Sequence, residues 1–281
     1  MDSMSKLEIK NLVLKYDLKI GETNPNVDCP FCKSGEQSFS MTRTPAGIVY
    51  NCFRAKCGAK GFVPLLPHEI SAVPDKREFT PKIFNLPLRN FSDEECHKYF
   101  DKYELSSTIL RENGVKYDQT NHRVVLPVSN IDGYRWGYVA KKLQGSEYSG
   151  PKAVAYFEQQ RPKLAYPKYI DSVPGWVAVV EDILSAIKVS QIVESVALMG
   201  TSLNDDAAAE LASRYHKLII LLDPGAEQQA IKIANKYRLY FNDVKICLLS
   251  ADPKDTPYKE LKGVIHGTIN PGRNVSGATS V

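Results

Sequence analysis

Apolar residues in the carboxyl-terminal part of the chain occur in short continuous runs that alternate with segments of helical pattern. Residues 176–180 and 218–222 are strand-length runs rich in β-branched or aliphatic side chains, which predicts strands buried on both faces. Repeated strand–helix units with short connections predict a parallel sheet between helices. The predicted strands are 176–180, 196–199, 218–222 and 244–249; the predicted helices are 183–190, one capped near Asn204 or Asp205, 227–240, and one with Thr256 as its cap, Pro257 at its first position and Gly267 after its end.

Upstream of these units, the pattern predicts short helices and a hairpin. Serines before acidic or apolar helical segments are typical N-caps, and alternating segments around an Asp-Gly pair are typical of a β-hairpin. The predicted elements are a helix from Ser92 towards Tyr103, a helix from Ser106 or Ser107 to Asn113-Gly114, and a hairpin of strands 122–128 and 134–142 around Asp132-Gly133. Residues 7–20 are apolar but too irregular to assign to a helix or a strand.

Four cysteines near the amino terminus form two close pairs. Cys29 and Cys32 are separated from Cys52 and Cys57 by a β-hairpin's length of chain, which is the spacing of a four-thiolate zinc ribbon. Between the pairs, segments 38–42 and 47–50 alternate as paired strands would. Four ligands close such a site, so its zinc would be structural rather than catalytic. The alternative is four unrelated buried cysteines.

Basic and aromatic side chains are interleaved within this ribbon. Such a mixture can hold single-stranded nucleic acid through charge and stacking. For the aromatic residues, a small ribbon core is an equally good interpretation, whereas Arg54 and Lys56, in the second cysteine turn, favour nucleic acid. The residues are Arg43, Arg54, Lys56 and Lys60, with Phe31, Phe39, Tyr50 and Phe53.

The composition limits the class of protein. The 281 residues are 43% hydrophobic and 24% charged, with a formal net charge of +4, as in ordinary globular proteins. The apolar runs are too short to cross a membrane, and residues 1–6 lack the apolar core of a signal peptide, so we expect a cytoplasmic protein. Six cysteines without an export signal favour metal or free thiols over disulfides, and Cys96 and Cys247 fall in patterns typical of core positions.

Prolines divide the chain into parts. Prolines and mixed charge after residue 63 interrupt all periodic patterning, which predicts a linker between domains. The small, polar carboxyl-terminal end predicts a disordered tail. We therefore expect an α/β protein (α+β overall) with a β-type zinc ribbon at 1–63, a linker at 64–88, the first part of a larger core at 89–173, a parallel-sheet domain at 174–266 and a tail at 267–281.

Two carboxylates directly follow two of the predicted buried strands. Glu181 comes after strand 176–180, and Asp223 comes after strand 218–222. Parallel strands end at the same edge of a sheet, where ligands bind, so we expect the two side chains side by side. Such a pair of hard oxygen ligands suits Mg²⁺.

Basic residues are frequent in and after the predicted hairpin. They could form one face that binds nucleic acid, but scattered lysines usually belong to the solvated surface, and the pattern alone does not separate the two interpretations. The residues are Arg123, Lys141, Lys142, Arg161, Lys163 and Lys168.

The order of these parts resembles that of bacteriophage DNA primases. A four-cysteine ribbon of the form CPFC…CFRAKCG, a proline-rich linker and a Toprim-type α/β domain are the parts of stand-alone phage primases and of the primase halves of phage primase–helicases. The resemblance covers roughly residues 25–265. It implies a primase catalytic core with a Toprim domain. The implied reaction is nucleotidyl transfer that makes short RNA primers from ribonucleoside triphosphates on single-stranded DNA, with one structural Zn²⁺ and catalytic Mg²⁺ or Mn²⁺.

The resemblance also assigns roles to individual residues. Glu181 matches the catalytic, metal-associated glutamate, and Asp223 matches the first aspartate of the family's Asp-x-Asp motif. Asp252 and Asp255 lie where the family has a further acidic cluster, which implies magnesium binding. Two stretches match the family's basic motifs and imply that Lys141 and Lys168 contact template or nucleotide: Arg123 to Pro127 with Gly133, Gly137 and Lys141, and Pro167-Lys168-Tyr169-Ile170.

Two positions depart from the family's pattern. Asp182 replaces the glycine that usually follows the glutamate, and Gly225 replaces the second aspartate. A register shifted by two would instead leave Leu221 at the first aspartate, so one carboxylate is absent in either alignment. A second metal ion would need Asp182, Asp252 or Asp255, or the phosphates of the nucleotide.

Two other functions stay open on the sequence. The primase fold could serve as a catalytically weakened module that binds single-stranded DNA or loads a replisome. A Toprim nuclease or topoisomerase-like enzyme would need a nucleophilic tyrosine, such as Tyr166 or Tyr169. The sequence contains no GxxxxGK[ST] P-loop, so the primase interpretation implies a separate replicative helicase and a DNA polymerase as partners, and no membrane.

Overall fold

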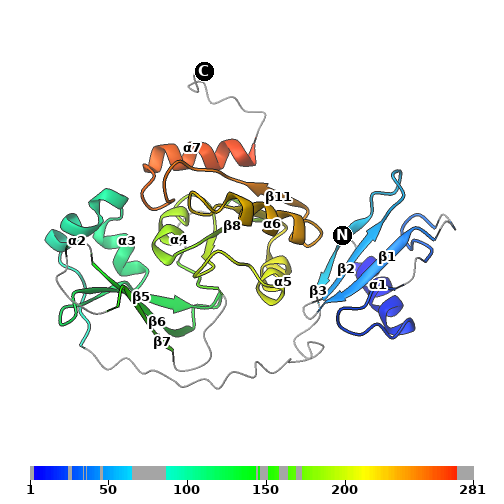
Figure 1. The fold of residues 1–281 in the computed structure, drawn as a ribbon, viewed down its shortest axis with the longest axis horizontal. Coiled ribbons are helices and arrows are strands. Elements are labelled where there is room, and N and C mark those ends of the chain that lie inside the picture. Colours follow the sequence, from blue (N-terminus) through cyan, green and yellow to red (C-terminus); the bar gives the residue numbers. More distant parts are fainter. Residues whose placement is uncertain are drawn as a thin grey trace. The chain divides into compact units, whose positions relative to one another are not determined.

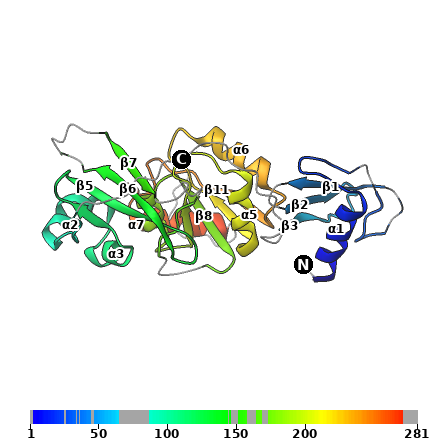
Figure 2. The same ribbon diagram turned by 90° about the horizontal axis from the view of Figure 1, so that it is seen from below.

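The computed structural model describes residues 3–24, 27–33, 35, 37–44, 47–64, 87–143, 145, 151–157, 164–168 and 173–270. Figures 1 and 2 show the helices and strands in colours that follow the sequence. The chain forms two compact units: Met1–Asp75 with Leu203–Leu218 and Lys232–Val244, and Lys76–Ser202 with Ile219–Ile231 and Lys245–Val281. Most of the predicted linker (64–88) and of the predicted tail (267–281) lies outside the described residues.

A three-stranded antiparallel sheet and one helix form the amino-terminal part of the chain (Figure 1). The pairing of β1 with β2, in which Phe39 lies opposite Cys52, confirms the predicted ribbon hairpin. Ile9 and Val13 of the helix join Met41 and Ile48 of the sheet in one hydrophobic cluster. The elements are α1 (Ser3–Lys15), β1 (Phe39–Thr44), β2 (Gly47–Cys52) and β3 (Lys60–Pro64).

The sequence pattern predicts neither α1 nor β3. Ile9 and Val13 are spaced for one helical face, but they lie in an otherwise mixed segment. In β3 only Phe62 and Val63 are buried, and the strand ends at Pro64. Both elements therefore depend on tertiary packing against β2 and the ribbon core more than on local pattern.

Two short helices and a four-stranded antiparallel sheet open the second unit. Ser92 and Ser106 cap α2 and α3 as predicted, and the Glu95 side chain accepts a hydrogen bond from the Ser92 N–H, which completes a capping box. The pairing of β5 with β6 confirms the predicted hairpin, although its loop extends from Asn130 to Tyr134. The elements are α2 (Asp93–Phe100), a 3₁₀ turn (Asp101–Tyr103), α3 (Ser107–Glu112), β4 (Lys116–Asp118), β5 (Arg123–Ser129), β6 (Arg135–Lys142) and β7 (Ala153–Phe157).

The predicted strand–helix units contribute a further four-stranded sheet, with the strand order β11-β10-β8-β9. Every residue of β8 is buried, as its unbroken apolar run predicts, and β8 pairs in parallel with β9. The α/β fold class is therefore confirmed. The elements are β8 (Trp176–Val180), α4 (Ile183–Val189), β9 (Ser195–Ala197), α5 (Asp205–Arg214), β10 (Lys217–Ile220), α6 (Glu227–Tyr237), β11 (Asp243–Ile246) and α7 (Tyr258–Ile269).

Several predicted element ends are wrong, and the last helix shows why. Pro257, not Thr256, is the N-cap of α7. The Thr256 hydroxyl instead donates to the carbonyl oxygens of Ala251 and Asp252, so it closes the preceding turn. Gly267 does not end α7, which continues to Ile269. Strands β10 and β11 stop before the predicted residues 222 and 249, and α6 stops before residue 240.

One hydrophobic cluster runs through the second unit. It joins Phe100 of α2 and Leu126 of β5 to Val180 of β8, Ile187 of α4 and Leu261 of α7. The antiparallel sheet and the strand that precedes Glu181 therefore share a core, which holds the two parts of this unit together. Within the described residues, no helix has both the length and the apolar character that crossing a bilayer requires.

Candidate functional site

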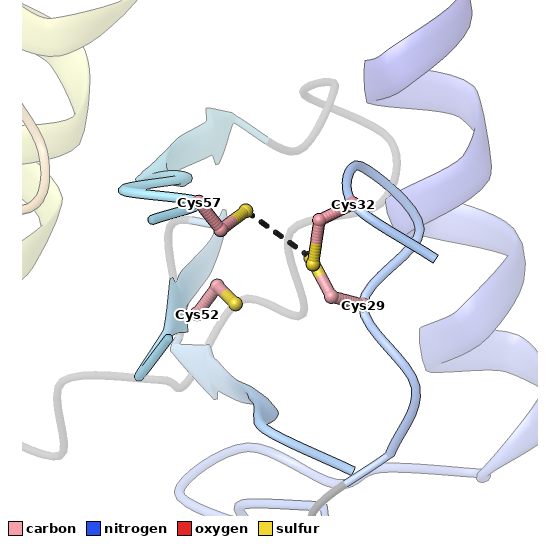
Figure 3. Close-up of side chains that lie close together, drawn as sticks. All are labelled: Cys29, Cys32, Cys52 and Cys57. Carbon is pink, nitrogen blue, oxygen red and sulfur yellow. Dashed lines mark hydrogen bonds between the residues drawn. The ribbon is translucent and has the colours of Figure 1, made fainter. Parts of the chain in front are cut away.

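The four predicted zinc cysteines lie together. The sulfur atoms of Cys29, Cys32, Cys52 and Cys57 are all within 4.8 Å of one another, and among the described residues this is the only group of three or more His, Cys, Asp or Glu side chains so arranged. Figure 3 shows the four side chains pointing toward one another, and the Sγ atoms of Cys29 and Cys57 are 3.8 Å apart. The structure thus supports the predicted zinc ribbon over four unrelated cysteines.

Two tight turns position these sulfur atoms. The Lys33 N–H donates to the Cys29 carbonyl, and the Cys57 N–H donates to the Arg54 carbonyl, so each pair sits in its own turn. Gly58 follows with a φ of +62°, a conformation that favours glycine. Burial raises the pKa of the Cys29 thiol to about 12, so a cation is needed to keep it ionised, and the donor set fits zinc.

The aromatic residues of the ribbon divide into two groups. Phe39 and Tyr50 are buried, and Phe31 stacks on Tyr50 with 5.5 Å between ring centroids, so these three rings belong to the ribbon's own packing. Phe53 is 66% exposed in the second cysteine turn. Lys56 is also exposed in that turn and Arg54 is half-buried there, so this turn presents the ribbon's charge and aromatic surface together.

The basic residues in and after the hairpin do not all lie on one face. Lys141 and Lys142 are consecutive on β6, so their side chains point to opposite sides of the sheet. The Lys141 ammonium lies 3.6 Å from the Asp182 carboxylate. Lys168 is exposed, and its backbone N–H donates to the Asn113 side chain. Arg161, Lys163 and Tyr169 lie outside the described residues.

Arg123 is buried, although the resemblance places it in a basic motif that would contact nucleic acid. Its side chain is only 2% exposed. Its guanidinium donates to the carbonyl oxygens of Ala140, at 3.2 Å, and Pro151, at 2.6 Å, so it ties β5 to β6 and to the segment before β7. A buried guanidinium engaged with backbone carbonyls stabilises the sheet and does not fit the predicted contact with nucleic acid.

Glu181 and Asp223 lie side by side, as predicted from their two strands. The Asp223 backbone N–H donates to the Glu181 Oε1 at 3.1 Å. Asp223 Oδ1 is buried and has no hydrogen-bond partner, so this oxygen is available as a ligand for a cation. The pair therefore fits Mg²⁺, whose preferred ligands are carboxylate oxygens.

The electrostatics of the pair agree with that fit. Burial, and then the nearby charges of Asp252 and Glu181, raise the pKa of the Asp223 carboxyl to about 6. Burial likewise raises the pKa of Glu181, and the Asp252 and Asp182 carboxylates add to the effect. Two carboxylates that both resist ionisation gain more from a bound cation than two exposed ones would.

The loop before α7 brings a third acid and a lysine to the same place. Lys254 Nζ lies 2.5 Å from Asp252 Oδ2, 3.0 Å from Asp182 Oδ2 and 3.9 Å from Asp255 Oδ2. Asp252 influences the pKa of both Glu181 and Asp223, whereas Asp255 is 40% exposed. Of the two predicted aspartates, it is therefore Asp252 that influences the Glu181–Asp223 pair. Lys254, which lies between the two aspartates in the chain and was not predicted as a site residue, contacts Asp252.

Lys188 holds this loop. Its side chain is fully buried on α4, and its ammonium donates to the carbonyl oxygens of Thr256, at 2.5 Å, and Lys254, at 3.2 Å. The third partner is the Glu104 carboxylate at 3.2 Å, which also accepts from the Tyr258 N–H. A single lysine inside a helix of buried residues is the one signal in the sequence that could have indicated such a role.

Gly225 takes a backbone conformation that favours glycine, at the position where the resemblance implies a second aspartate. Its φ is +93°, in the region that favours glycine, and its N–H donates to the Glu227 carboxylate. The turn after Asp223 therefore depends on a glycine at this position. An aspartate there would bring the missing carboxylate only with a strained or rebuilt turn.

A cavity of about 650 Å³ lies in the second unit. It is lined by the β5–β6 loop, the end of α3, the start of α4 and Lys168. Arg135, Asn113, Asn130 and Tyr166 give it charged, polar and aromatic walls. Nothing in the sequence predicts this cavity, because its walls come from segments far apart in the chain.

Comparison with known proteins gives a fold but no sequence family. No family model matches the chain, and no curated protein matches its sequence. The Aquifex aeolicus primase (zinc-binding and RNA polymerase domains) is 18% identical, with a TM-score of 0.50 over 94% of this chain and 82% of that one. The primase fragment of the bacteriophage T7 primase–helicase protein is 12% identical, with a TM-score of 0.50 over 88% of this chain and 100% of that one. The chain therefore has the fold of a primase zinc-binding domain joined to a primase RNA polymerase domain.

Proposed function

We propose that this chain is a DNA primase that makes short RNA primers on single-stranded DNA. The observation that carries the proposal is the pair Glu181 and Asp223, joined by a 3.1 Å hydrogen bond at the ends of buried strands in a primase fold. The unpartnered, buried Asp223 Oδ1 gives this pair a place for a metal ion. The four-cysteine cluster adds the structural zinc that such a ribbon needs.

The proposed chemistry is nucleotidyl transfer. Mg²⁺ held by Glu181 and Asp223 would activate the primer 3′-hydroxyl and neutralise the triphosphate. Glu181 and Asp223 would hold the ion, Lys254 and Lys141 would supply positive charge beside it, and Asp252 would complete the acidic site. Asp255, more exposed, would contribute less.

Template binding is proposed for two surfaces. In the ribbon, exposed Phe53 would stack on a base while Arg54 and Lys56 pair with phosphates. In the second unit, Lys168 and Arg135 line a cavity of about 650 Å³ that also offers Tyr166. Lys142 would contact nucleic acid only from the opposite side of β6 to Lys141.

The same proposal covers the partners and the origin. A chain that makes primers would act with a replicative helicase and a DNA polymerase, and its substrates would be ribonucleoside triphosphates and single-stranded DNA. The CPFC…CFRAKCG ribbon, which resembles those of phage primases, supports a phage-encoded enzyme that works in the host cytoplasm.

Incorporation of labelled ribonucleotides tests the activity. The full chain is incubated with mixed-sequence single-stranded DNA and all four ribonucleoside triphosphates, first with Mg²⁺ and then with Mn²⁺. We expect short oligoribonucleotides whose first bases reveal the start site. Glu181→Ala should abolish them, whereas Glu260→Ala, which removes an exposed carboxylate of α7, should leave them unchanged. Undiminished synthesis by Glu181→Ala would overturn the assignment.

A second function is favoured by one observation. Among the described residues, no three carboxylates have oxygen atoms within 4.8 Å of one another, and an aspartate at Gly225 would be strained. A module that binds single-stranded DNA without catalysis is consistent with both facts. This function predicts that the chain binds single-stranded DNA in buffer that contains neither Mg²⁺ nor EDTA. It also predicts that no oligoribonucleotide is made with Mg²⁺ or with Mn²⁺.

A further inference from the structure

A fixed ammonium group stands among the acidic side chains at the end of β8. Lys254 is only 15% exposed, and its Nζ contacts Asp252 at 2.5 Å and Asp182 at 3.0 Å. Burial disfavours its charge, but the Asp182 and Asp252 carboxylates more than compensate and raise the pKa of Lys254. The site therefore holds a permanent positive charge at neutral pH.

The backbone that carries this ammonium is also fixed. Lys188, fully buried, donates to the carbonyl oxygen of Lys254 itself and to that of Thr256. Glu104 braces the same turn by accepting from the Tyr258 N–H. Both ends of Lys254, its carbonyl and its ammonium, are thus held by buried or half-buried partners, so the charge has little freedom to move away.

The carboxylates that could bind a second metal ion are already engaged. Asp182 Oδ1 accepts from the Ser185 N–H as the N-cap of α4, and its Oδ2 faces Lys254 and Lys141. Asp252 Oδ2 contacts Lys254. Among the described Asp and Glu side chains, the one buried oxygen without a partner is Asp223 Oδ1. Lys254 therefore occupies the carboxylate oxygens of Asp182 and Asp252 that face it, whereas Asp255, 40% exposed, lies 3.9 Å from the same ammonium.

We propose that the chain binds a single divalent cation, between Glu181 and Asp223, and that the Lys254 ammonium takes the place of a second cation. The inference rests on the proposed function, which assigns that pair to Mg²⁺. With no nucleotide bound, a second divalent ion at Asp182 or Asp252 would have to displace an ammonium held by both carboxylates. Lys254 would then serve the incoming triphosphate as a compact phosphate-binding charge in place of the second ion.

Counting bound Mn²⁺ tests the inference without any reaction. The zinc-loaded full chain is titrated with Mn²⁺ in the absence of nucleotide and DNA, and free Mn²⁺ is measured by electron paramagnetic resonance. We expect one tightly bound ion per chain in the wild type. Lys254→Met frees Asp252 and Asp182 and should bring the count to two, whereas Lys254→Arg, which keeps the charge, and Lys259→Met, an exposed lysine of α7, should leave it at one.

Two results would overturn the inference. One is two ions of equal affinity in the wild type, which needs no variant and so holds even if Lys254→Met does not fold. The other is a folded Lys254→Met chain, checked by circular dichroism, that still binds one ion. The Mn²⁺ count and the primer-synthesis assay can fail independently. One bound ion without primer synthesis would contradict the proposed function only, and two bound ions with primer synthesis would contradict this inference only.

Discussion

The ammonium of Lys188 lies 2.5 Å from the carbonyl oxygen of Thr256, sixty-eight positions away in the chain. This contact joins α4, the helix that starts just after Glu181, to the loop that carries Asp252 and Lys254. Because the loop's place beside Glu181 depends on this lysine, the geometry of the acidic site and the stability of the fold are linked through one side chain.

Replacing Lys188 should therefore destabilise the protein. Lys188→Met keeps the length of the side chain but leaves two carbonyl oxygens without their donor, at a cost of roughly 1–3 kcal/mol in the free energy of unfolding. Urea denaturation measures this. The matched control is Lys236→Met, whose 2.9 Å ion pair with Asp205 is exposed and should contribute less than about 0.5 kcal/mol. Equal effects of the two substitutions would contradict a special role for Lys188.

The carboxylate of Asp223 should lower stability at neutral pH when no Mg²⁺ is present. Its pKa rises from 3.8 in the unfolded chain to about 6 in the folded one, so the stability it contributes is complete below pH 3.8 and is lost as the pH rises through 6. Asp223→Asn imitates the neutral form. We expect it to raise the free energy of unfolding at pH 7.5 by about 1 kcal/mol, after allowance for partial exposure, and by roughly half as much at pH 5.

Urea denaturation at the two pH values, in buffer that keeps zinc but lacks Mg²⁺, measures that difference. Asp206→Asn, which changes an exposed carboxylate on α5, should show no such dependence on pH. Added Mg²⁺ should stabilise the wild type more than Asp223→Asn, because the variant lacks one ligand. A variant that is less stable than the wild type at pH 7.5 would contradict the raised pKa.

Zinc should be lost when one cysteine of the cluster is replaced. Cys57→Ser removes one of four sulfur ligands that lie within 4.8 Å of one another. Metal analysis of the purified protein should then find well under one zinc per chain, and the ribbon should unfold because burial keeps thiols such as Cys29 from ionising alone. Cys96→Ala, at a buried cysteine of α2, should retain one zinc, so equal zinc in both variants would exclude the site.

Arg123 and Lys168 should respond in opposite ways to the same substitution. Lys168→Met, at an exposed side chain, should weaken binding of single-stranded DNA several-fold and reduce the slope of log affinity against log salt by about 0.7, with little change in stability. Arg123→Met should cost roughly 1–3 kcal/mol of stability, because it removes the buried donors to Ala140 and Pro151.

Fluorescence anisotropy with labelled DNA and urea denaturation separate the two effects. DNA binding is compared under conditions in which both variants are folded, below the unfolding transition of the less stable one. If Arg123→Met instead binds DNA as poorly as Lys168→Met while keeping full stability, the structural role assigned to Arg123 is wrong.

Local signals in the sequence predict most of the elements, the cysteine cluster and the adjacency of Glu181 and Asp223. The buried run of β8 places Glu181, the serine caps place α2 and α3, and the spacing of the cysteine pairs predicts the cluster, because each depends on residues a few positions apart. The adjacency of Glu181 and Asp223 follows from the parallel order of strands that end beside each other.

Contacts between distant segments are what the sequence could not predict. Lys188 and Lys254 look like ordinary lysines until the fold brings the loop at 252–257 against α4. Arg123 lies in a basic motif, yet its partners Ala140 and Pro151 bury it. The opposite directions of Lys141 and Lys142 follow from strand geometry alone, so an analysis that respects the alternation along β6 could have found them.

The left-handed turn at Gly225 also limits how this chain can change over generations. With a φ of +93°, the position accepts an aspartate only at a cost, although a new Cβ would meet no atom within 4 Å. A single mutation that restores the second carboxylate would thus arrive with a poorer backbone, and the benefit would appear only after a second change had reshaped the turn. Selection for stability therefore tends to keep glycine at this turn.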